Sequence, residues 1–263
     1  MRLAVVAPDI LGKSLMDITT SLAASRLLAQ QRAMDITANN IANANTPGFR
    51  TERVLFSDWI DQQPNAAKVP GGRTVTYTQD RATYRESQAG SVTHTGNPFD
   101  LALSGDGFFT VNTKSGPRLT RDGRFGPLPD GTLADSNGNA VLDVNGKPLK
   151  IASTDTQVTI SGDGSVSTIN GPIGKIGVVQ PTDQMKLRAE GATNFISDGP
   201  TAPVASPGIV QGAIEESNVQ PVMEVTRMMN DLRQFQFVTQ FVQAEGDRQQ
   251  NTIDKLLPSG SGG

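Results

Sequence analysis

Residues 10–43 contain no proline and a single glycine, Gly12, and their apolar side chains recur at spacings of three, four and seven. This period is typical of an amphipathic helix, and a helix of this length would extend about 50 Å. The period returns at 219–257, where Pro221 falls in the expected first turn, a position that tolerates its missing N–H. Helices this long bury their apolar stripes mainly against other helices. We therefore expect the two terminal helices to cover each other, or to be covered by other chains.

The apolar positions of the two helices define an expected assembly interface. In the C-terminal helix, heptad spacing defines two sets of five residues, one that begins at Met228 and a companion set that begins at Val225. Seven of these ten positions are apolar, as in a coiled-coil seam. Phe237 and Phe241 fall outside both sets, which indicates either a broad core-facing stripe or contact with more than one neighbour. The residues expected at the interface are Leu15, Ile18, Leu22, Leu27, Met34, Asn39, Asn40, Ile41, Asn43, Val225, Met228, Leu232, Phe235, Val242, Ile253 and Leu256.

The stretch 71–212 has a different texture, in which Gly or Pro interrupts short runs of β-branched and aromatic residues. Asx-Gly pairs between such runs predict hairpin turns, because Asn, Asp and Gly tolerate positive φ. We interpret the stretch as an antiparallel all-β domain. Its strand-like runs are RTVTYT (73–78), FDLAL (99–103), GFFTVN (107–112), QVTI (157–160) and IGVVQ (176–180), and its turn formers are Asp122-Gly123, Asp130-Gly131, Asn137-Gly138, Asn145-Gly146 and Gly162-Asp163-Gly164.

Composition argues against several classes of function. The net charge of −3 over 263 residues gives no bias toward nucleic acid or anionic membranes. No apolar run approaches the roughly 18 residues of a membrane span, and the N-terminal segment lacks the apolar region of about 7–15 residues found in secretory signals. The absence of Cys removes thiol chemistry and disulfides, and a single His cannot form a two-His metal motif.

Candidate chemical sites do not satisfy their motifs. DSNGNA (135–140) starts with the spacing of a calcium loop but lacks the glycine and the bidentate glutamate that follow in such loops. SGDGFF (104–109) is not followed by the Lys-Ser/Thr of a phosphate loop. No nucleophile motif accompanies His94, and nothing distinguishes Asp100 and Asp106 as an acid–base pair. We therefore expect no catalytic residue, no cofactor and no metal.

The segment ANNIANANTPGFR (38–50) places four Asn residues where the first helix should end. Short amides can cap orphan backbone groups and form lateral hydrogen bonds in a crowded bundle. Pro47-Gly48 should then turn the chain toward the β domain. The residues alone allow either a plain helix stop or a helix end that packs against neighbouring chains.

This Asn-rich segment resembles the N-terminal signature of the flagellar axial proteins, the family of rod, hook and hook-associated proteins. The resemblance continues in order along the chain. TGNPFDLALSGDGFFTV (95–111) is similar to the stretch that opens the β domain of rod and hook proteins, and LTRDGRF (119–125) with DGTLADSNGNAVL (130–142) is similar to the hairpin region after it. GAIEESNVQPVMEVTRMM (212–229) resembles the family's entry into the C-terminal helix.

The resemblance implies an α+β fold in which long N- and C-terminal helices form a coiled-coil-like bundle and a central antiparallel all-β domain lies between them in sequence. The domain boundaries expected on this basis are an N-terminal helix at 1–48, a β-rich middle at 49–211 and a C-terminal helix at 212–257. Residues 258–263 have the Gly/Ser composition of a flexible tail.

The resemblance also implies a structural subunit of the bacterial flagellar basal-body rod, which polymerises through its terminal helices and transmits torque from the motor to the hook. Chain length leaves the proximal-rod and the distal-rod types. The segments TYTQDRATYRESQAGSVTHTGNP (76–98) and RQFQFVTQFVQAEGDRQQ (233–250) are more similar to the proximal-rod type, and both types stay open. The implied partners are copies of the chain, neighbouring rod proteins and the flagellar type III export apparatus.

The same resemblance implies export to the periplasm-spanning rod without a cleavable signal peptide, and neither a small-molecule substrate nor a membrane span. The alternative class is an adhesin, a β domain displayed on a helical stalk. Aromatic residues make up 5% of the chain, which is a poor supply of platforms for sugar stacking.

Overall fold

The computed structural model describes residues 9–61, 75–152, 155, 157–183 and 186–256. The chain divides into two compact units. Unit 1 combines Met1–Asn39, Glu52–Arg85 and Val222–Gly263, and unit 2 combines Asn40–Thr51 with Glu86–Pro221. The segment Glu52–Arg85, which the sequence assigns to the β-rich middle, therefore clusters with the terminal helices. The domain boundaries expected at 48 and 211 stay a prediction.

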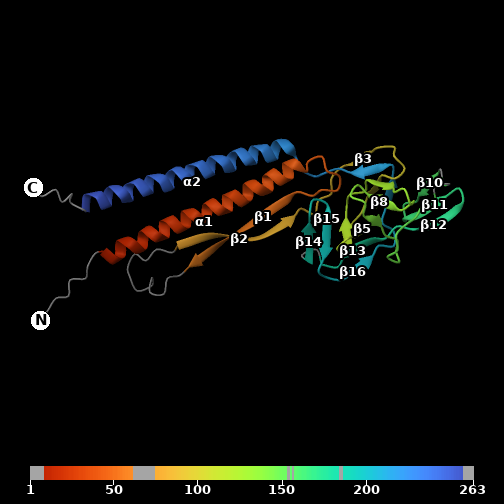
Figure 1. Ribbon diagram of the computed structural model, residues 1–263, viewed down its shortest axis with the longest axis horizontal. Coiled ribbons are helices and arrows are strands. Elements are labelled where there is room, and N and C mark those ends of the chain that lie inside the picture. The colour runs from red at the N-terminus through yellow and green to blue at the C-terminus, as the bar shows by residue number, and fades with distance from the viewer. Residues whose placement is uncertain (1–8, 62–74, 153–154, 156, 184–185, 257–263) are drawn as a thin grey trace, which may run out of the picture. The chain divides into compact units, whose positions relative to one another are not determined.

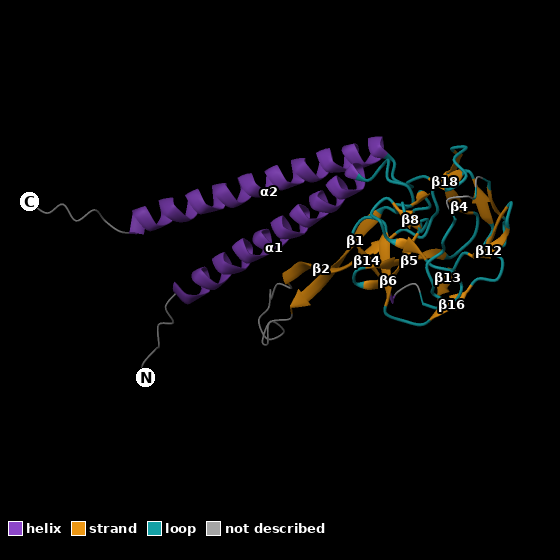
Figure 2. Ribbon diagram, turned by 45° about the vertical axis from the view of Figure 1, so that its right-hand side comes forward, coloured by secondary structure: helices purple, strands orange, loops and turns teal. Residues whose placement is uncertain are grey.

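Two long helices carry the ends of the described chain. Helix α1 spans Asp9–Ala42 and helix α2 spans Pro221–Leu256. Within unit 1 they run side by side in opposite directions (Figure 1; Figure 2). The expected fold class, long terminal helices packed together with antiparallel sheets between them in sequence, is confirmed.

Helix α1 ends in the Asn-rich segment as predicted. The N–H groups of Asn43 and Ala44 donate to carbonyls three residues back, which tightens the last turn. Asn43 Oδ1 accepts a hydrogen bond from the Thr46 hydroxyl at 3.2 Å. Gly48 then adopts φ 67°, and its N–H donates to the Glu215 carbonyl at 2.8 Å. A side chain on Gly48 would place Cβ 2.3 Å from the backbone carbon of Arg121, so both the turn and the close approach require glycine.

The strands are short and all their pairings are antiparallel. Their bounds are β1 Glu52–Asp61, β2 Val75–Arg85, β3 Val92–His94, β4 Leu101–Leu103, β5 Phe108–Thr113, β6 Gly116–Thr120, β7 Phe125–Pro127, β8 Leu133–Asp135, β9 Ala140–Val141, β10 Val158–Ile160, β11 Ser165–Thr168, β12 Gly171–Lys175, β13 Val178–Pro181, β14 Leu187–Glu190, β15 Asn194–Ser197, β16 Thr201–Pro203, β17 Ile209–Gln211 and β18 Ala213–Glu215.

Unit 1 holds the β1–β2 hairpin, and unit 2 holds the other sheets. The largest of them follows the order β14-β15-β6-β5-β9-β8-β7, and β13 joins it by pairing with both β5 and β16. Strands β10-β11-β12 form a three-stranded sheet, and β17-β4 and β18-β3 form two-stranded ones. The main core of unit 2 lies among these strands and consists of buried Leu101, Leu103, Phe109, Val111, Phe125, Leu133, Val141, Leu149, Ile151, Ile160, Val166, Ile176, Val178 and Ile209.

Four of the five predicted turns are present. Gly131, Gly138, Gly146 and Gly164 adopt φ between 75° and 92°. Each turn also has an Asp that accepts the backbone N–H two residues on, as Asp130 does from Thr132 at 3.0 Å. This hydrogen bond holds the pKa of Asp130 below its ordinary value. The fifth prediction is wrong, because Asp122-Gly123 links β6 to β7 and those two strands do not pair.

Gly123 is required for a different reason, the close approach of another segment. A Cβ at this position would lie 1.6 Å from the Leu101 carbonyl oxygen, and the Leu101 N–H donates to the Gly123 carbonyl. We expect Gly123→Ala to cost about 3 kcal/mol of unfolding free energy, because the backbone of β4 must move. Gly126→Ala is the matched control, since a Cβ there meets nothing within 4 Å. Equal denaturant midpoints for the two variants would contradict this account.

Candidate assembly site

One face of α2 is covered within unit 1. Apart from Thr239, its less exposed positions alternate in steps of four and three, the spacing of a coiled-coil seam. We call these residues the inner stripe: Glu224, Met228, Asp231, Phe235, Val238, Val242, Glu245 and Gln249. Met228, Phe235 and Val242, which the sequence predicts for the interface, lie on it. Val225 and Leu232 lie off it and are 46% exposed.

The buried positions of α1 are mostly small or polar, with Ile36 as a large apolar exception. Buried positions on this helix include Ala23, Ala29, Gln30, Ile36 and Thr37. The Gln30 amide donates to Gln234 Oε1 on α2 at 3.4 Å. Between the helices lies an apolar groove of about 270 Å³, lined by Leu22, Ala23, Arg26, Phe237, Val238 and Phe241. The helix pair is thus in contact but leaves apolar surface accessible at this groove.

The opposite faces of both helices are exposed. On α2, four apolar side chains form an outer stripe at spacings of three and four: Val222 (78% exposed), Val225 (46%), Met229 (50%) and Leu232 (46%). On α1, an exposed stripe of the same spacing is mixed and carries three alanines, one leucine and two polar residues: Ala24, Leu28, Gln31, Asp35, Ala38 and Ala42. The two stripes therefore differ in character, because the stripe of α2 is apolar throughout.

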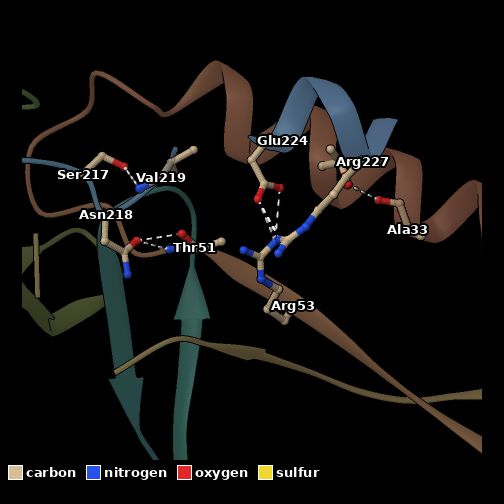
Figure 3. A network of polar contacts seen from close by, with 9 residues as sticks. Ala33, Thr51, Arg53, Ser217, Asn218, Val219, Glu224 and Arg227 are labelled. Atoms are coloured by element: carbon tan, nitrogen blue, oxygen red, sulfur yellow. Dashed lines mark hydrogen bonds and ion pairs between the residues drawn. The ribbon is translucent and has the colours of Figure 1, made fainter. Parts of the chain in front are cut away.

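An ion-pair cluster fixes the first turns of α2 within unit 1. The Glu224 carboxylate is buried and accepts from Arg53 Nη1 of β1 at 2.9 and 3.1 Å, and from Arg227 Nη1 at 2.8 Å. Figure 3 shows the carboxylate directed toward the ends of both arginine side chains. A buried carboxylate is tolerated only when it is paired in this way. The sequence alone does not indicate this cluster, since nothing in the periodicity marks Arg53 as the partner of Glu224.

A second cluster of buried charges lies inside unit 2. Arg121 Nη1 donates to Glu215 Oε2 at 3.0 Å, and Arg50 Nη2 lies 3.6 Å from Glu215 Oε1. Arg121 Nη2 also donates to the Gly105 carbonyl, and both guanidinium groups lie within 6 Å of the Phe108 ring centroid. Burial lowers the pKa of Arg121 from its ordinary value, and the Glu215 carboxylate opposes that shift.

Hydrogen bonds join the segment that follows α1 to the segment that precedes α2, all within unit 2. Asn218 Oδ1 accepts from both the N–H and the hydroxyl of Thr51 at 2.7 Å (Figure 3). Asn218 Nδ2 donates to the Gln88 carbonyl, and the Glu86 N–H donates to the Thr51 carbonyl. Together with Arg50–Glu215, these contacts hold the two chain connections together.

The remaining predicted interface residues have varied environments. Asn40 is fully buried and Asn39 is exposed. The side chains of Leu22, Leu27, Met34, Ile41 and Asn43 are partly buried. Leu15, Ile18, Ile253 and Leu256 lie outside the side chains that the structure describes. The assembly role of all of these residues stays a prediction.

The candidate chemical motifs are structural in this protein. Asp135 of DSNGNA accepts from the backbone N–H groups of Asn137 and Asn139 in a hairpin turn. Asp100 is buried and accepts from the Thr95 hydroxyl and the Asn97 amide. Among the described residues, no group of three or more His, Cys, Asp and Glu side chains could hold a metal ion. Within the same residues, neither helix is long and apolar enough to cross a membrane.

Asp231 on the inner stripe should make the helix pair pH-dependent. Burial raises the pKa of Asp231 above 3.8, with a further increase from Glu224, while Arg227 opposes the shift. Because the pKa of Asp231 is higher in the folded than in the unfolded state, its charged form destabilises the fold at neutral pH. This destabilisation is relieved as the pH falls through the folded pKa toward 3.8. Asp231→Asn should therefore stabilise α2 at pH 7, and its advantage over the natural chain should shrink toward pH 4. Hydrogen exchange of α2 at both pH values measures this, and an advantage that grows on acidification would contradict it.

Comparisons with known proteins agree with this architecture. The family described as "Flagella basal body rod protein" matches residues 22–50, "Flagellar hook protein FlgE/F/G D1 domain" matches 102–168, and "Flagellar basal body rod FlgEFG protein C-terminal" matches 210–255. The three segments cover much of α1, the main β region and most of α2.

Three full-length relatives are informative. Flagellar basal-body rod protein FlgF of Caulobacter vibrioides is 35% identical over 92% of this chain and 98% of its own length. FlgF of Mesorhizobium japonicum is 34% identical over 82% of this chain and 88% of its own length. Flagellar basal-body rod protein FlgG of Bacillus subtilis is 31% identical over 78% and 86%. The chain therefore belongs to the FlgE/F/G family of flagellar basal-body rod proteins, as a FlgF-like structural subunit of the rod and not an enzyme.

Proposed function

We propose that this subunit polymerises through its terminal helices in the proximal segment of the rod and transmits torque from the motor toward the hook. The observation that carries the proposal is the outer stripe of α2, Val222, Val225, Met229 and Leu232, whose apolar side chains are 46–78% exposed. An exposed apolar stripe of this regularity favours a protein–protein contact over a solvated surface. The occupant that we propose is a helix of a neighbouring rod subunit.

The two exposed stripes differ in character, and this supports an open polymer. The outer stripe of α2 is apolar throughout, whereas the exposed stripe of α1 combines alanines and Leu28 with the polar Gln31 and Asp35. A contact between unlike surfaces is heterologous, and heterologous contacts that do not close into a ring build helical filaments. Many modest helix contacts in such a lattice would add up to a stiff rod that can carry torque.

Proximal placement is supported by two of the relatives. The FlgF proteins of C. vibrioides and M. japonicum are 35% and 34% identical, compared with 31% for FlgG of B. subtilis. The three values are close, so the distal rod is the second candidate. Labelling of this chain in purified basal bodies would separate the two positions. Recovery of the chain only in a soluble periplasmic fraction of flagellated cells, and never in basal bodies, would refute the rod function itself.

The proposed partners are copies of the chain, neighbouring rod proteins and the flagellar type III export apparatus, through which the chain would leave the cell uncleaved. Mass spectrometry of the assembled protein should find the N-terminal residues retained. Removal of a leader of about 15–30 residues would contradict the export route.

A further inference from the structure

We propose that the guanidinium group of Arg50 receives a carboxylate from an acidic side chain of a neighbouring rod subunit, an inference that rests on the proposed function. Arg50 is the last residue of the Asn-rich segment, and its side chain is 10% exposed. The nearest carboxylate oxygen in the described part of the chain, Glu215 Oε1, lies 3.6 Å from its Nη2, beyond hydrogen-bond distance. The buried Nε likewise has no acceptor, so the guanidinium donates no hydrogen bond to the described residues.

The charges in the cluster around Arg50 do not balance. Two guanidinium groups, those of Arg50 and Arg121, lie beside the single carboxylate of Glu215, and all three side chains are buried. Arg121 is the better placed of the two, since its Nη1 donates to Glu215 Oε2 at 3.0 Å. Asp106 also attracts Arg121, but it is exposed and forms no ion pair with Arg50 in the described structure. The described residues thus leave the buried charge of Arg50 without a close counter-charge, an arrangement that is costly in a protein interior.

The two arginines also repel each other. Their guanidinium groups lie over the same ring, that of Phe108, at 5.9 Å from its centroid for Arg50 and 5.3 Å for Arg121. Burial lowers the pKa of Arg121, and the positive charge of Arg50 lowers this pKa further. An aromatic face attracts a cation but does not replace a charged acceptor. Arg50 therefore adds little to the stability of the free subunit, which is typical of a residue whose partner is another molecule.

The chemistry of the site favours a carboxylate as this partner. A guanidinium group holds five N–H donors in a planar fork that matches the two oxygens of a carboxylate. Arg50 is the arginine that a partner can reach, because its side chain is 10% exposed and that of Arg121 is 2% exposed. Copies of this chain carry a surplus of such groups, with 26 acidic residues against 23 basic ones. One bound carboxylate would give the cluster equal numbers of positive and negative charges.

A carboxylate bound at Arg50 would give each subunit a contact separate from the outer stripe of α2. Gly48 lies two residues before Arg50, and its N–H donates to the Glu215 carbonyl at 2.8 Å. The bound carboxylate would therefore hold the neighbouring subunit against the segment that follows α1, and the charge cluster would be completed on assembly.

The first test asks whether the free subunit requires Arg50. Arg50→Met keeps the unbranched stem of the side chain but removes its charge, and Glu215 keeps its hydrogen bond from Arg121. Loss of the 3.6 Å contact and relief of the repulsion oppose each other, so the thermal midpoint of the monomer should stay within about 2 °C of the natural value. Cells with this variant as their only copy should not swim, because the carboxylate of the neighbour is left unpaired. A fall of about 10 °C, as expected for Glu215→Leu, or normal swimming would overturn the proposal.

The second test identifies the partner in purified basal bodies. Arg50→Lys keeps the positive charge and places a primary amine at the site, and a carbodiimide joins an amine to a carboxylate in direct contact with it. We expect mass spectrometry to find an amide bond between the introduced amine and an Asp or Glu of another subunit. A bond to Glu215 of the same chain alone, or no bond, would overturn the proposal.

Arg118→Lys is the matched control for the cross-linking. Arg118 pairs with Glu190 of its own chain, so this variant should yield the bond to Glu190 and show that the reagent acts on such pairs. Bonds to other subunits at equal yield from both variants would also overturn the proposal, because the reagent would then not report a specific contact. Absence of the natural chain from basal bodies would refute the rod function and the inference with it, whereas a bond to Glu215 alone overturns the inference and leaves the rod function intact.

Discussion

Glu215→Leu should lower the thermal midpoint of unit 2 by about 10 °C or more. The substitution removes the acidic partner of Arg121, whose side chain is 2% exposed, and of Arg50, whose side chain is 10% exposed. Breaking a buried ion pair from one side costs about 3–5 kcal/mol, because the remaining charge stays buried without its partner. Hydrogen exchange at the amides of β4 and β5 measures the loss directly in the full chain.

Glu190→Leu is the matched control for this prediction. Glu190 also pairs with an arginine, Arg118, but its side chain is 46% exposed. Water can replace the contact at that position, so the thermal midpoint should hardly change. Similar losses for the two variants would show that burial of the Glu215 cluster is not the source of its contribution.

A further comparison separates charge from shape within the cluster. Arg121 also donates to the Gly105 carbonyl and lies 5.3 Å from the Phe108 ring centroid. Glu215→Gln keeps the size and one acceptor of the side chain but removes the negative charge. We expect its midpoint to fall between those of the natural chain and Glu215→Leu, since a neutral acceptor satisfies the guanidinium only in part.

Elements whose determinants are local could be predicted from the sequence. Both terminal helices follow from long stretches of 3.6-residue periodicity, and the end of α1 follows from Pro47 and Gly48. Four hairpin turns were predictable because Asp, Asn and Gly determine their own backbone conformation. Asp122-Gly123 has the same composition, but contact with Leu101 decides its structure.

Contacts between distant segments could not be predicted in this way. The partners Arg53 and Glu224 are 171 residues apart, and Arg121 and Glu215 are 94 apart. No periodicity relates such residues, and only the folded backbone brings them together. Heptad spacing likewise indicates Met228 and Phe235, which lie on the inner stripe, but it pairs them with the set that contains Val225 and Leu232. In the structure the stripe continues instead through Asp231 and Val238, and Leu232 is exposed.

The two faces of α2 make opposite predictions for charge substitution. Phe235 lies on the inner stripe, so Phe235→Asp should separate the helices of the monomer by burying an unpaired carboxylate. Val225→Asp with Leu232→Asp changes two outer positions that are each 46% exposed. Exposed substitutions typically alter stability by about 0.5 kcal/mol or less, so this monomer should keep its natural helicity and exchange protection. A variant that combined Leu232→Asp with Phe235→Asp would mix the two effects.

In assembly the same outer double variant should have the largest effect of all. If a neighbouring rod subunit covers the outer stripe, two carboxylates become buried in each contact, at a cost of several kcal/mol that repeats at every interface of the polymer. Cells that carry this chain as their only copy should build no complete basal bodies and should not swim. Ala244→Asp with Asn251→Asp is the matched control, because it adds the same charges at the same seven-residue spacing to exposed positions off the stripe. If the outer variant folds as a monomer and the cells still swim, the outer stripe is not part of the assembly interface. If motility is lost in both the outer variant and the control variant, the effect comes from the added charge and not from the stripe.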